Sequence, residues 1–288
     1  MPVSCRVAAA VILNVVCLPA VAQPVAFEVA SVKPNPAQDF RAMSMKSLPG
    51  GRFTATDLPL RVLISVAYNL PMNPTERLAG APDWTLADRF DIEAKAPEAA
   101  FPPGMAASAA RARMQAMIRS LLADRFQLVM HHETRDLPVY ALTVAKNGPR
   151  LAPATLEETD CPPGPSDGLT CHNFNGGIGR GLHAKAVTMK DLAEYIENWT
   201  DLPVIDETGL NGMFAIETEG WTPMRLPPPP PPGASVNPAP RPSGDGDMTD
   251  PTRPTLFVVL QKLGLDLKRQ KGSVDVYTVE HIEHPAAN

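Results

Sequence analysis

The sequence lacks the charge pattern that marks several large classes of protein. Only 6% of its 288 residues are aromatic, no run of basic residues stands out, and the formal net charge is −5, from 26 basic and 31 acidic residues. A nucleic-acid-binding protein normally carries a basic footprint, so we predict no nucleic-acid partner. The composition, with 44% hydrophobic residues, also excludes a collagen, a coiled coil and a polytopic membrane protein.

The sequence also lacks a recognisable catalytic constellation. Neither G-x-S-x-G nor S-x-x-K surrounds a credible nucleophile. His131-His132-Glu133 is not H-E-x-x-H, and adjacent side chains of a strand point to opposite faces. The segment Asp206–Gly209 has one residue too many for an aspartic-protease motif, and the Gly-rich segment Gly176–Gly181 leads into a strand rather than a helix. We therefore predict no catalytic residue, no metal ligand and no cofactor.

The segment Met1–Ala22 has the order of a secretory signal peptide. Arg6 precedes the apolar run Val7–Leu18, and the small-residue triplet Ala20-Val21-Ala22 follows. The run is shorter than the roughly 20 apolar residues of a membrane span. We expect cleavage after Ala22, a mature chain without a transmembrane segment, and a periplasmic or extracellular location.

The sequence has only four cysteines. If the protein is exported, its compartment determines whether the two cysteines of the mature chain form a disulfide. Removal of the leader takes away Cys5 and Cys17 and leaves Cys161 and Cys171 in the segment CPPGPSDGLTC. Two thiols on one short loop in an oxidising compartment favour a disulfide. A zinc site is the alternative, but it needs about four ligands and only His172 lies immediately beside the cysteines.

The chain shows a weak internal repeat. Phe53 matches Leu182, Leu60 matches Met189 and Leu63 matches Leu192 at one constant offset, and Phe90, Phe126 and Val139 match Phe214, Leu265 and Val274 in the same order. Self-similarity in a fixed order indicates a duplicated supersecondary unit. Chance alignment of short amphipathic segments is the alternative.

Each half is predicted to be a β-α-β-α-β-β unit. Apolar residues at helical spacing follow the first strand of each half; they are Leu60, Leu63, Ile64 and Ala67, then Met189, Leu192, Ala193 and Ile196. We expect Asp57 and Thr188 to cap these helices. Each half is predicted to end in its own hairpin, residues 126–130 with 139–144 and residues 265–267 with 274–279 across Lys271-Gly272.

The predicted fold class is therefore α+β: two duplicated β-α-β-α-β-β units with mainly antiparallel sheet, joined by a disulfide-bearing loop. The expected divisions are a signal peptide (1–22), a first unit (23–146), a turn-rich connector (147–181) and a second unit (182–288). Inside the second unit, residues 223–254 contain six consecutive prolines, Pro227–Pro232. We expect this stretch to be a solvated, disordered insert.

Six ordered motifs carry a family resemblance; they are FEVASVKPNP, GGRFTATDLPLRVLISVAYNL, GAPDWTLADRFDIEAKAP, LLADRFQLVMHHETRDLPVYALTVAK, DLPVIDETGLNGMFAIETEGWTP and LGLDLKRQKGSVDVYTVEHIEHP. The chain resembles a family of soil-bacterial exported proteins of unknown function that is expanded in acidobacteria. A similar domain follows membrane metallopeptidases resembling beta-lactam-sensing antirepressor proteases, but this chain lacks their zinc motif. The resemblance implies export. Because the family has no known active site, it assigns no catalytic residue to this chain. The strand–helix starts also look like N-terminal domains of secretins and TonB-dependent receptors, which is an analogy of fold only.

Two functions follow from this pattern. The favoured one is a non-catalytic binding module of the periplasm or cell envelope, which recognises a protein, peptide or envelope ligand through sheet edges and a cleft between the units. The alternative is a hydrolase acting on an envelope or environmental polymer through dispersed carboxylates such as Asp88, Asp91 and Glu93.

One loop is the candidate binding surface. The segment Gly80–Trp84 has no counterpart in the second half, and Trp84 with Asp83 and Arg89 is predicted to form an amphipathic recognition patch. The alternative is that Trp84 caps the core beneath the loop.

Overall fold

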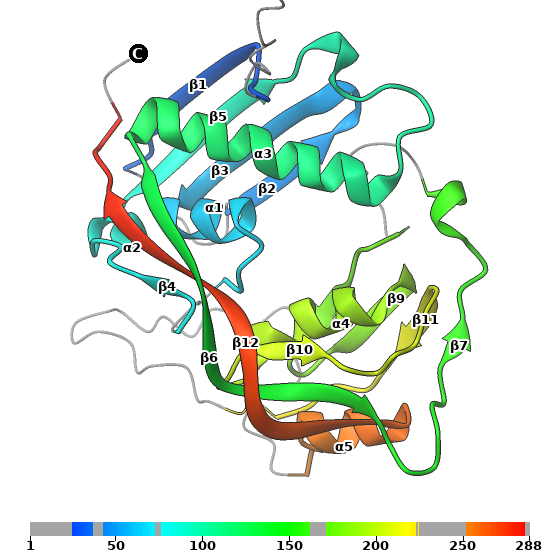
Figure 1. Cartoon of the computed structure of the whole chain (residues 1–288). Coiled ribbons are helices and arrows are strands. Elements are labelled where there is room, and N and C mark those ends of the chain that lie inside the picture. Colours follow the sequence, from blue (N-terminus) through cyan, green and yellow to red (C-terminus); the bar gives the residue numbers. More distant parts are fainter. Residues whose placement is uncertain are drawn as a thin grey trace, which may run out of the picture.

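The computed structural model describes residues 25–36, 43–72, 76–161, 171–222, 224 and 252–285. The predicted signal peptide and nearly all of the Pro-rich insert lie outside the described residues. Helices accompany mainly antiparallel sheets, so the chain is an α+β protein, as predicted. Two lobes, each with its own sheet, are joined by two long strands that cross the middle of the molecule (Figure 1).

The first lobe contains a four-stranded antiparallel sheet in the order β1-β5-β3-β2. Helices α1 and α3 pack beside it, and the long helix α3 covers one face of the sheet (Figure 1). The elements are β1 (Val29–Pro34), β2 (Ser44–Leu48), β3 (Arg52–Pro59), α1 (Leu60–Ala67), α2 (Trp84–Ala87), β5 (Arg89–Lys95) and α3 (Ala107–Phe126).

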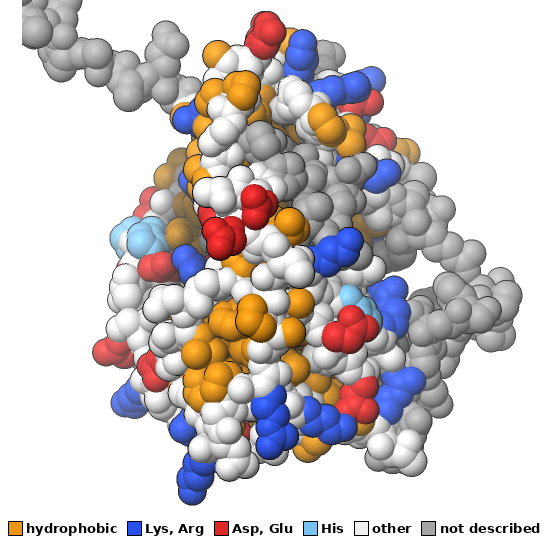
Figure 2. Space-filling model, turned by 90° about the vertical axis from the view of Figure 1, so that its right-hand side faces the viewer, with side chains coloured by type: hydrophobic (Ala, Val, Ile, Leu, Met, Phe, Trp, Pro, Cys, Tyr) orange, Lys and Arg blue, Asp and Glu red, His pale blue; other side chains and the backbone are white. Residues whose placement is uncertain are grey.

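The second lobe contains a smaller antiparallel sheet in the order β7-β11-β9-β8. Its elements are β7 (Ala152–Pro153), β8 (Asn175–Gly177), β9 (Gly181–Val187), α4 (Met189–Ile196), β11 (Phe214–Glu217) and α5 (Leu256–Lys262). On the side of the molecule that carries β7, hydrophobic side chains gather over the lower half among charges of both signs (Figure 2). The described part of this face therefore offers apolar contact area rather than a basic track.

A third sheet, in the order β10-β6-β12-β4, joins the lobes. Its centre is an antiparallel ribbon of β6 (Val129–Val144) and β12 (Leu265–His281). The short strand β4 (Leu78–Ala79) of the first lobe pairs in parallel with β12, and β10 (Val204–Asp206) of the second lobe pairs in parallel with β6.

The two predicted hairpins are wrong. Lys271 and Gly272 lie in the middle of β12, opposite Pro138 and Leu137, rather than in a turn. Each long strand runs through both lobes, so each hydrophobic core receives residues from β6 and from β12. The sequence pattern could not reveal this exchange, because alternation of apolar residues fixes which face of a strand is buried but not which strand is its partner.

The two lobe sheets have the same strand order and matching registers. Leu58, Phe90 and Pro34 lie in one row across β3, β5 and β1, and Val187, Phe214 and Pro153 lie in the corresponding row across β9, β11 and β7. Both rows adjoin an irregularity at which β3 and β9 each have one residue more than their partner. The lobes therefore share details of pairing as well as the order of their elements.

The predicted helix stripes are core residues. Leu60, Leu63 and Ile64 are buried in the first hydrophobic cluster, and Met189, Leu192 and Ile196 are buried in the second. Thr188 caps α4 as predicted, since its Oγ1 accepts a hydrogen bond from the backbone N–H of Asp191 at 3.1 Å.

The predicted cap of α1 is wrong. Pro59 occupies the N-cap position and no side chain caps the helix. Asp57 lies in the left-handed region, at φ 50°, and its buried carboxylate accepts a hydrogen bond from Arg89 Nη1 at 3.0 Å. The guanidinium of Arg89 is a stronger hydrogen-bond partner than the N–H groups of a helix end, and it draws the carboxylate into the core.

The predicted disulfide is confirmed, because Cys161 and Cys171 are bonded and their Cα atoms lie 5.7 Å apart. Both cysteines are buried, and Ala186 of β9 packs with them. No helix in the described part of the chain is both long enough and apolar enough to span a membrane.

Candidate binding cleft

A cavity of about 490 Å³ lies between the two lobes. The first lobe contributes β2, α3 and the segment that follows α1. The second lobe contributes the residues after Cys171, helix α4 and the short 3-10 helix η4 (Glu197–Trp199). Ligand pockets typically measure about 300–1,000 Å³ and occur preferentially at such junctions. We call this cavity the interlobe cleft.

Much of the lining of the interlobe cleft is apolar. Phe53 and Ile118 are buried in the core beneath it, whereas Met45 and Met72 are 39% and 48% exposed. The remaining apolar lining includes Met114 and Phe174. Methionine side chains adapt their shape to different apolar partners. This part of the cleft can therefore bind apolar groups of different shapes, because the methionine side chains adjust to them.

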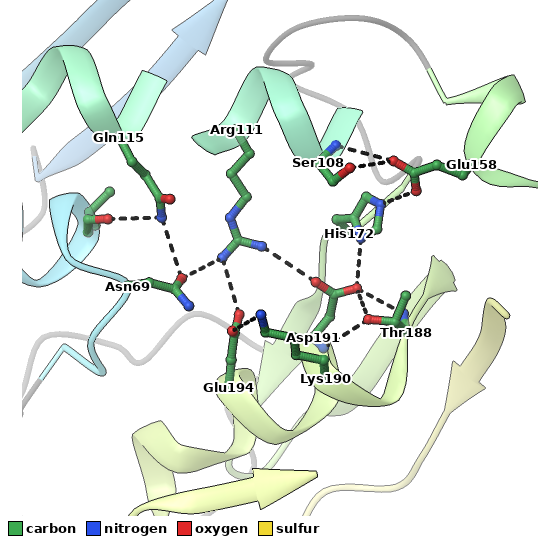
Figure 3. Close-up of polar contacts among 11 residues, drawn as sticks. Asn69, Ser108, Arg111, Gln115, Glu158, His172, Thr188, Lys190, Asp191 and Glu194 are labelled. Atoms are coloured by element: carbon green, nitrogen blue, oxygen red, sulfur yellow. Dashed lines mark hydrogen bonds and ion pairs between the residues drawn. The ribbon is translucent and has the colours of Figure 1, made fainter. Parts of the chain in front are cut away.

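Arg111 extends from α3 across the cleft toward α4 (Figure 3). Its Nη2 donates a hydrogen bond to Asn69 Oδ1 at 3.2 Å. The carboxylates of Asp191 and Glu194 lie 3.6 and 3.9 Å from its guanidinium nitrogens, beyond hydrogen-bond length. Its side chain is 45% exposed, so the guanidinium keeps donors available toward the cleft.

His172 links two carboxylates at one end of the cleft (Figure 3). Its Nδ1 lies 2.7 Å from Asp191 Oδ2 and its Nε2 lies 2.6 Å from Glu158 Oε2. The hydrogen bond with Asp191 is the main cause that raises the pKa of His172 to about 9, and the pair with Glu158 adds to it against the effect of burial. At neutral pH His172 is therefore an imidazolium that donates from both nitrogens.

The two carboxylates anchor His172 to separate elements. Glu158 accepts a hydrogen bond from Ser108 Oγ at 2.8 Å, near the start of α3. Asp191 accepts hydrogen bonds from the backbone N–H and the hydroxyl of Thr188 at the start of α4. Burial alone would raise the pKa of Asp191, but the hydrogen bonds from His172 and Thr188 lower it. The network therefore fixes the beginnings of α3 and α4 on either side of the disulfide loop.

A buried ion pair closes the other end of the cleft. Arg77 Nη1 lies 3.0 and 3.1 Å from the two carboxylate oxygens of Glu197, and its Nε donates to the backbone oxygen of Asp275 in β12. Burial raises the pKa of Glu197 despite the opposing charge of Arg77. The pair ties α4 of the second lobe to the segment that leads into β4.

The cysteines and His172 do not fit a zinc site. Ligand atoms of Glu158, Cys161 and His172 lie within 4.8 Å of one another. Zinc is bound through a thiolate and about four ligands, whereas Cys161 is in the disulfide and both nitrogens of His172 are hydrogen-bonded to carboxylates. This cluster is an ion network that supports the cleft.

A family model described as "Protein of unknown function (DUF3738)" matches residues 61–282, which is about three quarters of the chain. The chain belongs to this family. No curated protein and no solved structure matches it. The DUF3738 match extends from α1 into the residues after β12, so it includes α3, α4 and most residues that line the interlobe cleft.

Within the DUF3738 region, the three predicted patch residues lie in different environments. Trp84 is half-buried at the start of α2, packs against the first core, and stacks on His284 with ring centroids 3.9 Å apart. Asp83 is exposed at the N-cap position. Arg89 is buried, with its side chain 4% exposed, and donates to Asp57. A recognition patch could therefore use Trp84 and Asp83, but not the guanidinium of Arg89.

The carboxylates of the alternative hydrolase do not line the interlobe cleft. Asp88 lies 2.8 Å from His284 Nε2. Asp91 accepts hydrogen bonds from Asn35 and from the backbone N–H of Asp57, and Glu93 is exposed on the same strand. Each position is explained by local structure, either as a hydrogen-bond acceptor of the sheet or as a solvated side chain.

The other polar motifs have structural roles as well. Asp206 accepts hydrogen bonds from the backbone N–H and hydroxyl of Thr208, which is the turn expected from these residue types. His132 lies 2.9 Å from Asp275 and stacks on Tyr277, whereas His131 lies near Glu280. The neighbouring histidines therefore have different partners.

Sequence reasoning missed Arg111, Asn69 and His172 as residues of a site. Arg111 lies on α3, whose sequence has no motif that marks a site, and Asn69 lies in the left-handed region just after α1. His172 was noticed only as a neighbour of Cys171. A signal exists for Asp191, since Thr188 and Asp191 have the spacing of a capping box, but this spacing gives no indication of His172.

Proposed function

We propose that this protein is a non-catalytic binding module of the periplasm or cell envelope, and that its ligand occupies the interlobe cleft. The observation that carries the proposal is the cavity of about 490 Å³ to which both lobes contribute. Apolar side chains and a partly exposed guanidinium converge there, which is the usual composition of a ligand pocket.

Binding is favoured over hydrolysis by the pairing of the charged groups in the cleft. The imidazolium of His172 donates from both nitrogens, so it has no lone pair with which to accept a proton from water. Glu197 is held by Arg77. A hydrolase would need a base or an acid that faces the substrate, and these groups instead face each other.

An exported location is supported by the disulfide. Cys161 and Cys171 are buried and bonded, and such bonds persist mainly in oxidising compartments. The leader at residues 1–22 adds to this proposal from the sequence. Cleavage after Ala22 can be tested by determining the N-terminus of protein recovered from the periplasm.

We also propose that the two lobes arose by duplication. Support comes from the shared strand order, the matching rows around Phe90 and Phe214, and the extra residue at the same place in β3 and β9. In the duplicated arrangement the final strands are exchanged, because β4 of the first lobe pairs with β12 and β10 of the second pairs with β6.

A fluorescent apolar probe tests whether the cleft binds ligands. We expect 1-anilinonaphthalene-8-sulfonate to bind the folded protein saturably and with a stoichiometry of one. Ser47→Trp should weaken this binding at least tenfold, because Ser47 lines the cleft from β2. Ser44→Trp is the matched control on the same strand, at a position that does not line the cleft.

A second variant covers the case in which Ser47→Trp does not fold. Met45→Asp places a charge on the apolar wall at a residue that is 39% exposed, where folding tolerates it. Unchanged probe affinity in a folded Met45→Asp or Ser47→Trp variant would show that the cleft is not the binding site.

The surface at Trp84 and Asp83 is the second place at which a ligand could bind. Trp84 is half-buried, and removing a packed tryptophan costs up to about 3–5 kcal/mol. If the side chain serves recognition, Trp84→Ala retains most of the stability and loses ligand capture. A strongly destabilised variant would instead identify Trp84 as a cap of the first core.

A further inference from the structure

We infer that the interlobe cleft selects a small apolar molecule that carries one carboxylate, and that Arg111 binds this carboxylate. The inference rests on the proposed function and specifies its ligand. It depends on how the charges that line the cleft are already used, on where the apolar lining lies, and on the donors that Arg111 retains.

Among the described residues, three cations line the cleft, and two of them, Arg77 and His172, are held in ion pairs. Arg77 is held by both oxygens of Glu197, with the Arg77 and Glu197 side chains 15% and 5% exposed. His172 is held by Asp191 and Glu158 and is 10% exposed. If either cation left its carboxylate partners, a buried charge would remain unpaired, which is costly in free energy. These two cations therefore do not serve a ligand that binds reversibly.

Arg111 differs from both. Among the described residues that line the cleft, it is the only cation that makes no hydrogen bond with a carboxylate, since its hydrogen bond goes to Asn69 Oδ1. Its side chain is 45% exposed, and the nearest carboxylate oxygens lie at 3.6 and 3.9 Å. A guanidinium has five N–H donors arranged as a fork that matches a carboxylate. Arg111 can therefore take a ligand carboxylate without breaking a short ion pair.

The neighbouring acids do not prevent this. Asp191 accepts hydrogen bonds from His172 and from Thr188 on Oδ2, whereas its Oδ1 lies 3.6 Å from Arg111, beyond hydrogen-bond length. Glu194 lies 3.9 Å from Lys190 as well as from Arg111. Lys190 is 78% exposed and can remain beside Glu194 when a ligand approaches Arg111. The carboxylates of Asp191, Glu194 and Glu158 together balance Arg111, His172 and Lys190, so a ligand carboxylate would be held by the unused N–H donors of the guanidinium rather than by an excess of positive charge.

The apolar lining defines the rest of the ligand. Met114 lies on the same helix as Arg111, one turn further along, and Ile118 lies one turn beyond it. Residues at this spacing share one face of a helix, so the guanidinium and the apolar lining are presented side by side. A carboxylate at Arg111 would leave an attached aliphatic or aromatic group in the cleft, where Met114 and Ile118 form the buried floor and Met45 and Met72 are the exposed apolar lining.

Matched ligands test the inference. We expect octanoate to bind the folded protein at least tenfold more tightly than octanamide, which has the same chain without the charge, as measured by titration calorimetry. Arg111→Gln should abolish this preference, and Arg111→Lys should retain only part of it because an ammonium lacks the fork. Lys185→Ala removes one exposed positive charge outside the cleft and should leave the preference unchanged.

A carboxylate on an apolar body can come from a free fatty acid or from the C-terminus of a peptide. N-acetyl-Ala-Ala-Leu and its C-terminal amide form the second pair of probes, and a preference for the acid in either pair supports the inference. Equal affinity for acid and amide in both pairs, or a preference that survives in Arg111→Gln, would overturn it. If the fluorescent probe still binds the cleft, the proposed function stands; if that probe also fails to bind, the proposed function fails with it.

Discussion

The two lobes carry different side chains at matching positions of their two sheets. In the first lobe, Asp57 lies at the irregularity of β3, and its carboxylate is paired with Arg89 in the core. In the second lobe, the constant offset that matches β3 with β9 places Ala186 there. When Phe90 is matched with Phe214, the residue of the second lobe that corresponds to Arg89 is Met213. Both Ala186 and Met213 pack with the disulfide.

Two sheets with the same strand order therefore have an ion pair at one irregularity and an apolar cluster at the other. A buried ion pair is strong only while both partners are present, and well-packed apolar residues of similar volume often serve equally well. The backbone differs slightly, since Asp57 has φ 50° and Ala186 is not among the residues with positive φ. Asp tolerates the left-handed region better than most residues, which suits it to the first lobe.

The largest expected effect comes from breaking the ion pair of the first lobe. Arg89→Met leaves the Asp57 carboxylate buried without its charge partner, and we expect the free energy of unfolding to fall by about 3–5 kcal/mol. The double variant Asp57→Ala/Arg89→Met introduces the residues of the second lobe and should regain more than half of the loss. The remainder reflects Ala at a positive φ, which costs about 1–2 kcal/mol.

Urea denaturation of the single and double variants measures both effects. Met213→Leu is a control of similar size in the second lobe, where a volume-conserving change should cost less than about 1.5 kcal/mol. A double variant that is no more stable than Arg89→Met alone would show that the two lobes do not tolerate each other's residues.

The comparison also separates what the sequence could predict from what it could not. The helix stripes at Leu60 and Met189, the cap at Thr188 and the disulfide were predictable, because each depends on spacing or on residue type within a short segment. The exchange of β6 and β12 was not, because strand pairing between segments far apart in the sequence leaves no local pattern.

The candidate site was harder to predict for the same reason. Arg111, Asn69 and Asp191 come from three segments and meet only after the lobes pack together. The sequence predicted a cleft between the units without its lining. It placed the candidate patch at Arg89 because that residue is charged and lies near Trp84, whereas burial beside Asp57 depends on the tertiary structure.

The next effect in size concerns the disulfide, which has no counterpart in the described part of the first lobe. Replacing Cys161 and Cys171 by Ala should lower the free energy of unfolding by about 2–3 kcal/mol, because the bond closes a loop across a separation of 10 residues. Hydrogen exchange should become faster in β8 and β9 of the second lobe. Equal acceleration in β2 and β3 would show instead that the two lobes unfold as one unit.

A smaller expected effect is a pH dependence of stability that arises in the second lobe alone. The pKa of His172 is raised to about 9 in the folded protein from about 6.5 in an unfolded chain. Its contribution to stability is therefore fully present below about pH 6.5 and is lost as the pH rises through about 9. The same constant offset between the halves places Met43, which does not titrate, at this position of the first lobe.

Denaturation at about pH 6 and about pH 9.5 tests this linkage. We expect the wild type to lose about 1–2 kcal/mol more than His172→Gln over this interval, a value reduced from about 1.4 kcal/mol per pKa unit because Glu158 is partly exposed. His183→Gln on β9 serves as the control. The same pH dependence in wild type and His172→Gln would contradict the assigned role of the imidazolium.

The smallest effect concerns the first α-helix of each lobe. Thr188 caps α4 through its Oγ1, whereas Pro59, the corresponding residue of α1, offers no side-chain cap. Thr188→Ala should therefore cost about 1 kcal/mol. Thr255 caps α5 through a longer hydrogen bond, 3.5 Å from the backbone N of Val258 to Thr255 Oγ1. Thr255→Ala should therefore lower the free energy of unfolding by less than Thr188→Ala does. A loss at Thr188 no larger than at Thr255 would mean that the hydrogen bonds that Asp191 accepts from His172 and from the Thr188 backbone N–H hold the start of α4 without the hydroxyl.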